Sequence, residues 1–103
     1  MSARRAALVL NPVAQRDVRS ILLYTRKQWG QSARDAYEEA LNQALLTLSE
    51  NPLIGRQRDA VPGDLRTFRV RQHMIYYRYS DDTLTVLRVL HGKMDPGQHV
   101  IEN

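Results

Sequence analysis

HMIYYRYSDDTLTVLRVLHGKMD, residues 73–95, is the stretch that decides the fold of this 103-residue chain. Tyrosine, arginine and aliphatic residues dominate it, a composition that favours strands over helices. The acidic pair Asp81-Asp82 predicts a tight turn, so we interpret the stretch as a β-hairpin. The second strand is almost entirely apolar, yet Arg88 lies at its centre and His91 at its end. A buried strand seldom holds a cation unless that cation is paired or functional, so Arg88 is a candidate for either role.

A further strand is predicted just upstream of the hairpin, in residues 65–71. Apolar and charged residues alternate there, which places Phe68 and Val70 on one face and Arg69 and Arg71 on the other. Together with strands at 74–79 and 84–90, this segment predicts a three-stranded antiparallel meander. The residues before it, 52–64, are rich in proline, glycine and charge and predict a surface loop.

The first part of the chain predicts a short strand followed by a helix. Residues 6–10 are apolar, Asn11 is a good N-cap, and Pro12 suits the first helical position. From there apolar residues recur at helical spacing until Gly30, which is a natural stop. The stripe consists of Val18, Ile21, Leu22, Thr25 and Trp29, and Leu23 and Tyr24 widen it. This width indicates either packing within the helices or a groove for a partner helix.

A second helix is predicted directly after Gly30, because Ser32 and Asp35 have the spacing of a capping box. It ends at Asn51-Pro52, and its stripe consists of Ala33, Ala36, Tyr37, Ala40, Leu41, Ala44 and Leu48. The two helices therefore form a hairpin with a very short connection. The complete order is β-α-α-β-β-β. We predict one α+β domain over residues 1–103, in which the helical hairpin packs on one face of a mostly antiparallel sheet.

The composition excludes several functional classes. The chain has no cysteine, which removes disulfides, thiolate metal sites and cysteine nucleophiles and fits a reducing cytoplasm. No stretch approaches the ~20 apolar residues of a membrane span. No metal-ligand spacing or glycine-rich phosphate loop occurs, so we expect no metal and no cofactor. The formal charge of +4 suits an acidic partner or nucleic acid, but no recognition-helix motif predicts direct sequence-specific nucleic-acid binding.

Five arginines in the sheet half are candidates for anion binding, because a cationic sheet face can hold phosphates or carboxylates bidentately. They are Arg66, Arg69, Arg71, Arg78 and Arg88. The alternative is a solvated face whose edge charges oppose aggregation. For Arg88, which lies between Leu87 and Val89, we favour function or a specific ion pair.

The tyrosines and histidines of the same strands each allow two interpretations. The tyrosines, which suit acid–base chemistry or base stacking but more commonly pack across strands, are Tyr76, Tyr77 and Tyr79. His91 suits a general base because imidazole titrates near neutrality, although a histidine at a strand end is usually structural. His73 and His99 have weaker claims.

The ordered set of short motifs along the chain resembles the ParE-type toxins of the RelE/ParE superfamily, small bacterial proteins neutralised by a co-expressed antitoxin. The resemblance runs nearly end to end. Its motifs are Ala14 with Asp17-Val18, Ile21 with Tyr24-Thr25, Trp29-Gly30, Ala36-Tyr37, Asn51-Pro52 with Gly55-Arg56, Leu65-Arg66, His73-Met-Ile-Tyr-Tyr-Arg78, and Arg88-Val-Leu-His91 leading to Met94-Asp95. The last of these motifs is the most specific.

The resemblance implies one of two activities. RelE-like members resemble ribosome-dependent mRNA endonucleases, whereas ParE-like members are associated with poisoning DNA gyrase. RNA cleavage needs proton-transferring groups and cations that hold the phosphate. The places where RelE-like nucleases carry two arginines and a tyrosine hold Met74, Met94 and Val100 here, with His99 beside the last. We therefore expect no enzymatic activity and no catalytic residues, but a toxin that binds gyrase and traps its cleaved DNA complex. A RelE-type endonuclease is the alternative.

The resemblance also implies two binding surfaces. The expected toxic surface consists of Arg69, Arg71, Arg78, Arg88, His91, Lys93, Met94 and Asp95. A disordered ParD-like antitoxin tail is expected to fold onto the chain. Its helix would contact Leu22, Leu23, Tyr24 and Trp29, and its carboxylates would face Arg69, Arg71 or Arg78. We expect a cytoplasmic toxin–antitoxin hetero-oligomer with no membrane partner.

Overall fold

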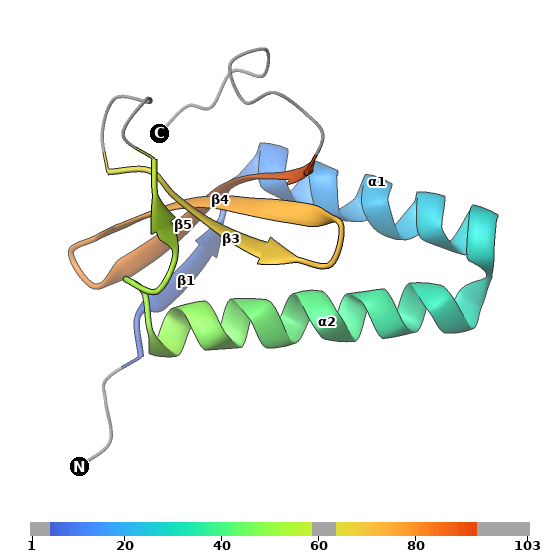
Figure 1. Cartoon of the computed structure of the whole chain (residues 1–103), viewed down its shortest axis with the longest axis horizontal. Coiled ribbons are helices and arrows are strands. Elements are labelled where there is room, and N and C mark those ends of the chain that lie inside the picture. The colour runs from blue at the N-terminus through green and yellow to red at the C-terminus, as the bar shows by residue number, and fades with distance from the viewer. Residues whose placement is uncertain (1–4, 59–63, 93–103) are drawn as a thin grey trace.

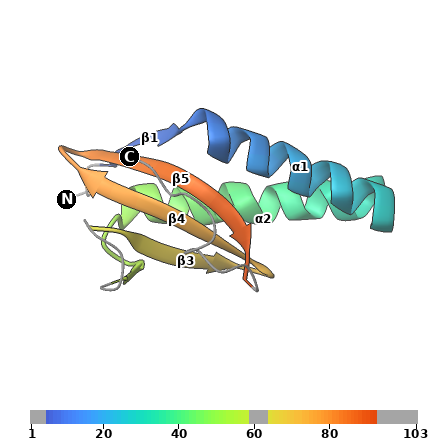
Figure 2. The same cartoon turned by 90° about the horizontal axis from the view of Figure 1, so that it is seen from above.

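The computed structural model describes residues 5–58 and 64–92, in which two helices pack on one face of a five-stranded sheet (Figures 1 and 2). In chain order the elements are β1 (Ala7–Leu10), α1 (Pro12–Trp29), α2 (Gln31–Glu50), β2 (Arg56–Gln57), β3 (Arg66–Val70), β4 (His73–Ser80) and β5 (Thr83–His91). The predicted α+β class, with a helical hairpin followed by an antiparallel meander, is confirmed. The two-residue strand β2 was not predicted, because it lies in the segment interpreted as a loop.

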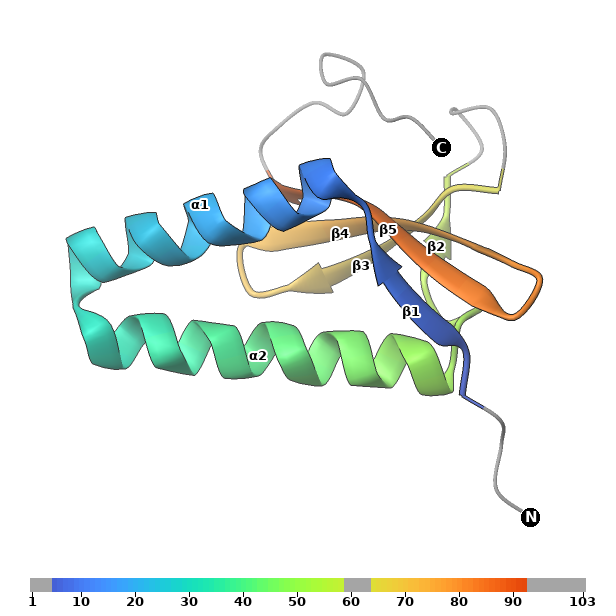
Figure 3. The same cartoon turned by 180° about the vertical axis from the view of Figure 1, so that it is seen from behind.

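The strand order is β1-β5-β4-β3-β2, so the first strand of the chain lies beside the last (Figure 3). β1 runs parallel to β5, with Leu8 opposite Leu84, and the other neighbouring strands are antiparallel. Between β4 and β5, Asp81 and Asp82 both have positive φ, 52° and 59°. This conformation suits the two-residue type I′ turn that joins twisted antiparallel strands. The turn predicted from the acidic pair is therefore confirmed.

The helical hairpin turns on a single residue, Gly30. α1 begins as predicted: the Asn11 side chain accepts a hydrogen bond from the Ala14 N–H (2.8 Å), and Pro12 occupies the first helical position. Gly30 ends α1 with a φ of 98°, a conformation that residues with a Cβ disfavour. α2 starts at the very next residue, so Ser32 lies inside the helix and no side chain caps it. The predicted capping box is therefore wrong.

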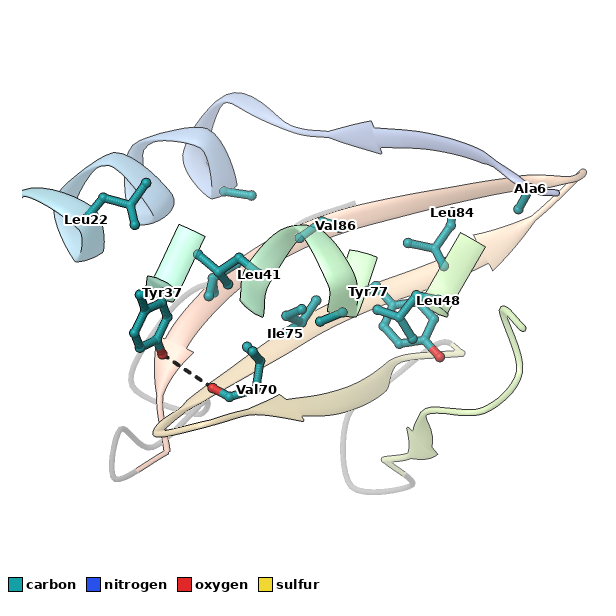
Figure 4. Packing of buried hydrophobic residues seen from close by; sticks show 13 residues of the cluster. Ala6, Leu22, Tyr37, Leu41, Leu48, Val70, Ile75, Tyr77, Leu84 and Val86 are labelled. Carbon is teal, nitrogen blue, oxygen red and sulfur yellow. Dashed lines mark hydrogen bonds between the residues drawn. The ribbon is translucent and has the colours of Figure 1, made fainter. Parts of the chain in front are cut away.

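The main core lies between the helical hairpin and the sheet (Figure 4). Its larger side chains are Leu22, Tyr37, Leu41 and Leu48 from the helices and Ile75, Tyr77, Leu84 and Val86 from the strands. A second buried cluster consists of Leu65, Tyr76, Leu87 and Leu90. Because successive strand residues point to opposite faces, Tyr76 lies on the sheet face away from the helices. Both faces of the central strands are thus buried, which explains the nearly continuous apolar sequence of β5.

Two side chains of the sheet hold the loop that follows α2. The Tyr77 hydroxyl accepts the Gly55 N–H and donates to the Pro52 carbonyl oxygen, both at 2.8 Å. The Arg66 guanidinium donates to the Gly55 carbonyl oxygen (3.1 Å). A Cβ at Gly55 would overlap the Tyr77 side chain, so this close approach requires glycine. The segment predicted as a loop therefore carries β2, paired with β3; residues 59–63 lie outside the described residues.

The helical hairpin extends past the sheet at the end where α1 and α2 meet (Figures 2 and 3). The helices contain 18 and 20 residues, which corresponds to about 27–30 Å at ~1.5 Å per residue. The β3–β4 turn and the end of β5 both stop short of this tip (Figure 2). The last turns of α1 and the first turns of α2 are therefore not covered by a strand.

Candidate binding site at the hairpin tip

A groove of about 550 Å³ opens where the helical hairpin extends past the sheet, and we call it the tip groove. α1 contributes Ser20, Ile21, Tyr24, Thr25 and Trp29, α2 contributes Ala33, Ala36 and Tyr37, and the end of the sheet contributes Arg71, Gln72, His73 and His91. The helical walls are mainly apolar and the sheet end is polar. This arrangement suits an amphipathic ligand, because apolar area supplies affinity and a few polar groups set orientation.

Two aromatic side chains at the tip groove are largely exposed: Tyr24 by 64% and Trp29 by 75%. Trp29 belongs to the predicted apolar stripe of α1, in which Leu22 and Thr25 are buried. Toward Gly30 the sheet no longer covers the apolar stripe of α1, because the strands end before the helices do. Exposed aromatic side chains beside a groove are typical of interaction surfaces. The tip groove is therefore the candidate functional site.

The floor of the tip groove is a hydrogen-bonded pair, Tyr37 and His73. The Tyr37 hydroxyl donates to the Val70 carbonyl oxygen (3.3 Å) and also bonds His73 Nδ1. The His73 and His91 rings meet edge to face with centroids 5.4 Å apart. Burial lowers the pKa of His73, and the neighbouring His91 lowers that pKa further.

Arg71 supplies the positive charge at the tip groove. Its guanidinium carbon lies 5.5 Å from the centroid of the Tyr37 ring, a cation–π geometry. Arg71 begins the β3–β4 turn with a φ of 52°, which is uncommon for a residue with a Cβ. β3 ends at Val70, so strand alternation does not continue to Arg71. The prediction that Arg69 and Arg71 share one face is therefore wrong.

Arg69 points away from the helices, because its neighbours Phe68 and Val70 pack in the main core. Its Nη1 donates to the Arg71 carbonyl oxygen (2.9 Å), and its guanidinium lies beside Gly92. A separate hollow of about 420 Å³ is lined by Arg69, Gln72, His91 and Gly92. This hollow and the tip groove share Gln72 and His91. Two guanidinium groups therefore flank the end of the sheet, one on each face.

Arg88 forms a bidentate ion pair with Asp17 of α1. The Nε–Oδ2 distance is 2.8 Å and the Nη2–Oδ1 distance is 3.0 Å. Asp17 Oδ2 also accepts the Val89 N–H (2.9 Å), beyond the point where β1 stops pairing with β5. This carboxylate thus completes the edge of the sheet, and its hydrogen bonds raise the pKa of Arg88. Of the two roles favoured for Arg88, function or a specific ion pair, the ion pair is present.

The remaining sheet residues are used mainly for packing and loop attachment. Arg66 holds the loop after α2, and Arg78 is half-buried on the face away from the helices. The Tyr79 hydroxyl donates to Asp82 (3.2 Å), and Met74 packs against the second buried cluster. The five arginines therefore do not form one continuous cationic face. The other members of the predicted toxic surface and ribonuclease comparison, Lys93, Met94, Asp95, His99 and Val100, lie outside the described residues.

The helical residues predicted to contact an antitoxin do not all lie on one surface. Tyr24 and Trp29 border the tip groove, whereas Leu22 is 7% exposed in the main core and offers little surface to a partner. Leu23 is exposed on the other side of α1, beside a smaller hollow. The sequence interpretation missed Tyr37 and His73 as floor residues. Tyr37 was assigned only to the apolar stripe of the second helix, and His73 had only a weak claim as a general base.

In the described segments, no group of three or more histidine, cysteine, aspartate or glutamate side chains is placed to hold a metal ion. No helix there is both long and apolar enough to cross a membrane.

Comparison with known proteins identifies the family. Residues 8–96 match the sequence model described as the ParE toxin of the type II toxin–antitoxin system, parDE. Toxin ParE1 of Mycobacterium tuberculosis is 33% identical over 88 residues, which cover 84% of this chain and 90% of that protein. Toxin ParE3 of Caulobacter vibrioides is 38% identical over 48 residues, 47% of this chain and 48% of that protein.

A solved structure supports the fold. A chain from the chromosomal ParDE TA system of P. aeruginosa superposes with a TM-score of 0.73, covering 86% of this chain and 98% of that chain. The two sequences are 17% identical, so the likeness concerns the fold alone.

Proposed function

This chain belongs to the ParE toxins of type II toxin–antitoxin systems, and we propose that it acts by binding DNA gyrase and trapping its cleaved DNA complex. A ParD-like antitoxin neutralises it by filling the tip groove. The family implies an antitoxin partner, and the tip groove supplies a surface that fits one.

The observation that carries the antitoxin site is the exposure of Tyr24 and Trp29 at an apolar groove of about 550 Å³. An amphipathic helix placed there would cover the part of the hairpin that the sheet leaves open. Arg71 at the end of the groove favours a carboxylate on the incoming segment. A following extended segment would then meet Arg69 on the other face of the sheet. Apolar burial supplies most of the affinity, and the two arginines set register.

The ribonuclease alternative is disfavoured at Met74, which stands where RelE-like nucleases carry an arginine. Met74 offers neither charge nor a transferable proton, and it packs in a buried cluster. A toxin that traps a cleaved complex needs no catalytic group of its own. The proposed activity is therefore not enzymatic.

The antitoxin site is tested by measuring the dissociation constant of purified toxin and antitoxin. Trp29→Ala should weaken binding about 30-fold or more, because truncating a central aromatic anchor typically costs at least ~2 kcal/mol. Ile54→Ala is the matched control, since Ile54 is an exposed apolar residue outside the groove. Hydrogen exchange on the complex should show protection in both the hairpin tip and β3. Protection confined to the loop after α2 would rule this binding mode out.

The target is tested with purified chain freed of antitoxin. It should inhibit gyrase supercoiling or accumulate cleaved DNA, and it should leave ribosome-bound mRNA intact. Codon-specific mRNA cuts that disappear in His99→Ala would instead establish the RelE-type endonuclease.

A further inference from the structure

The outward side of α1 carries a row of cations, Arg16, Arg19, Arg26 and Lys27, which we call the cationic stripe. All four residues are exposed. At 3.6 residues per turn they fall within an arc of about 100°, with Leu23 in its middle. The row is about 16 Å long at ~1.5 Å per residue. It lies apart from the tip groove, none of whose lining residues belongs to it.

Nothing in the described part of the chain neutralises the cationic stripe. None of its four side chains forms an ion pair or side-chain hydrogen bond there. Asp17, the only acidic residue of α1, is paired with Arg88 instead. Two acids of α2, Asp35 and Glu38, are also engaged, since both pair with Arg34. The positive field of the stripe is therefore directed at solvent.

The helix dipole accounts for only part of this arrangement. Arg26 and Lys27 lie in the last turn of α1, where the helix dipole favours cations. Arg16 and Arg19 lie in the first half of the helix, where the dipole gives no such benefit. They are also spaced i,i+3, so their like charges repel each other on the helix surface. Local helix electrostatics therefore favour Arg26 and Lys27 but do not favour Arg16 and Arg19.

The ligand chemistry follows from what surrounds the stripe. Arg19 and Arg26, together with Arg34 of α2, line a hollow of about 210 Å³ whose apolar lining residues are Leu22 and Leu23. Leu22 is buried, so Leu23 is the main exposed apolar side chain of this face. A protein partner gains most of its affinity from apolar burial, which this face scarcely offers. A polyphosphate needs only cations, because binding releases its condensed counterions.

We propose that the cationic stripe binds the phosphate backbone of duplex DNA without reading base sequence. This inference is independent of the gyrase target and of the antitoxin site. DNA on the stripe would leave the tip groove open, so both could be occupied together.

The test is fluorescence anisotropy of purified chain with a labelled 20-base-pair duplex at several salt concentrations. Four phosphate contacts predict a slope of log K against log salt of about −3.6. Affinity should then fall roughly 150-fold between ~50 and ~200 mM salt. A duplex of scrambled sequence should bind equally well. A strong preference for one sequence would overturn the proposal.

Two charge-matched double variants test whether the duplex binds at the cationic stripe. Arg16→Gln/Arg19→Gln should reduce the magnitude of the slope by about 2, at ~0.9 per contact. Arg56→Gln/Arg58→Gln removes the same charge elsewhere and should leave the slope nearly unchanged; circular dichroism confirms that both variants fold. Equal loss from the two pairs would show a general charge effect and overturn the site. Stripe-dependent binding of polyglutamate without binding of the duplex would also overturn it, in favour of an acidic protein partner.

Discussion

The two ends of the helical hairpin have similar apolar stripes, but the stripe is buried at one end and exposed at the other. At the sheet-covered end, Leu41 and Leu48 are buried in the main core, whereas at the tip Tyr24 and Trp29 are largely exposed. Composition does not separate them, since all four lie on amphipathic helices. The difference arises because the strands stop before the tip. An amphipathic stripe therefore predicts an apolar neighbour, but not whether that neighbour is in the same chain.

The charged groups show the same contrast. Arg88 is held by two hydrogen bonds from its guanidinium to Asp17 and is largely buried with it. Arg71, at the sheet end of the tip groove, lies over the Tyr37 ring on an exposed turn. The first arginine stabilises the sheet edge, and the second remains available to a ligand.

Alanine substitutions at the two ends of the hairpin should differ most in their effect on the free energy of unfolding. Leu48→Ala should lower the free energy of unfolding by about 2–5 kcal/mol, because it removes a fully buried side chain and leaves a cavity. Trp29→Ala should change it by no more than ~0.5 kcal/mol, although a larger side chain is lost. Urea denaturation of both variants measures the difference. A loss of several kcal/mol in Trp29→Ala would show instead that the tip is part of the core.

The next effect concerns the ion pair at the sheet edge. Asp17→Asn should lower the free energy of unfolding by about 2–3 kcal/mol, because the Arg88 charge loses its partner. This value is near or below the low end for a buried pair, since 18% of the Arg88 side chain still reaches solvent. Asp35→Asn, which loosens an exposed pair with Arg34, is the control and should cost at most ~0.5 kcal/mol. Chemical denaturation checks both values. Equal costs would mean that burial of the first pair is energetically unimportant.

A smaller effect compares two tyrosine hydroxyls. Tyr77→Phe should destabilise the chain by about 1–2 kcal/mol, because the Gly55 N–H and the Pro52 carbonyl oxygen each lose a partner. Tyr24→Phe removes a hydroxyl with no hydrogen bond in the described residues and should be neutral. Thermal denaturation of the two variants provides the measurement. If both were neutral, the loop after α2 would not depend on the Tyr77 hydroxyl.

The smallest effect is a pH dependence of stability at the groove floor. The folded-state pKa of His73 is lowered from its ordinary value of 6.5 by burial and by His91. Between pH 6.5 and that lower pKa, the unfolded chain therefore binds more protons than the folded chain. Stability should fall as the pH drops through this window and level off below the folded pKa. His73→Gln should flatten the profile of melting temperature between pH 7.5 and 5.5; an unchanged profile would assign the proton uptake elsewhere.

Much of the fold was predictable because its signals are local. Asn11-Pro12 and Gly30 bound α1 through backbone preferences, and Asp81-Asp82 tolerate the positive φ of a tight turn. The meander followed from β-forming composition. The structure corrected the capping box at Ser32 and the face assigned to Arg71, in both cases because an element began or ended one or two residues from the expected place.

The candidate site was only partly predictable. The wide stripe on α1 indicated a groove, and Tyr24 and Trp29 do border it. The floor pair could not be found by spacing, because Tyr37 and His73 are 36 residues apart and meet only when α2 packs on the β3–β4 turn. Leu22 and Trp29 could not be told apart either, since both fit the same helical face.

Local signals in the sequence predicted both helices, the acidic turn and most of the strand alternation, and the composition excluded cysteine chemistry, because each depends on neighbouring residues or on composition. Three features emerge only from the folded chain: β1 lies parallel beside β5, Asp17 pairs with Arg88 across 71 positions, and the strands leave the hairpin tip uncovered. These features depend on contacts between distant segments and on relative lengths of helices and strands. A periodic pattern does not contain that information, because it specifies which side of an element is apolar but not what lies against it.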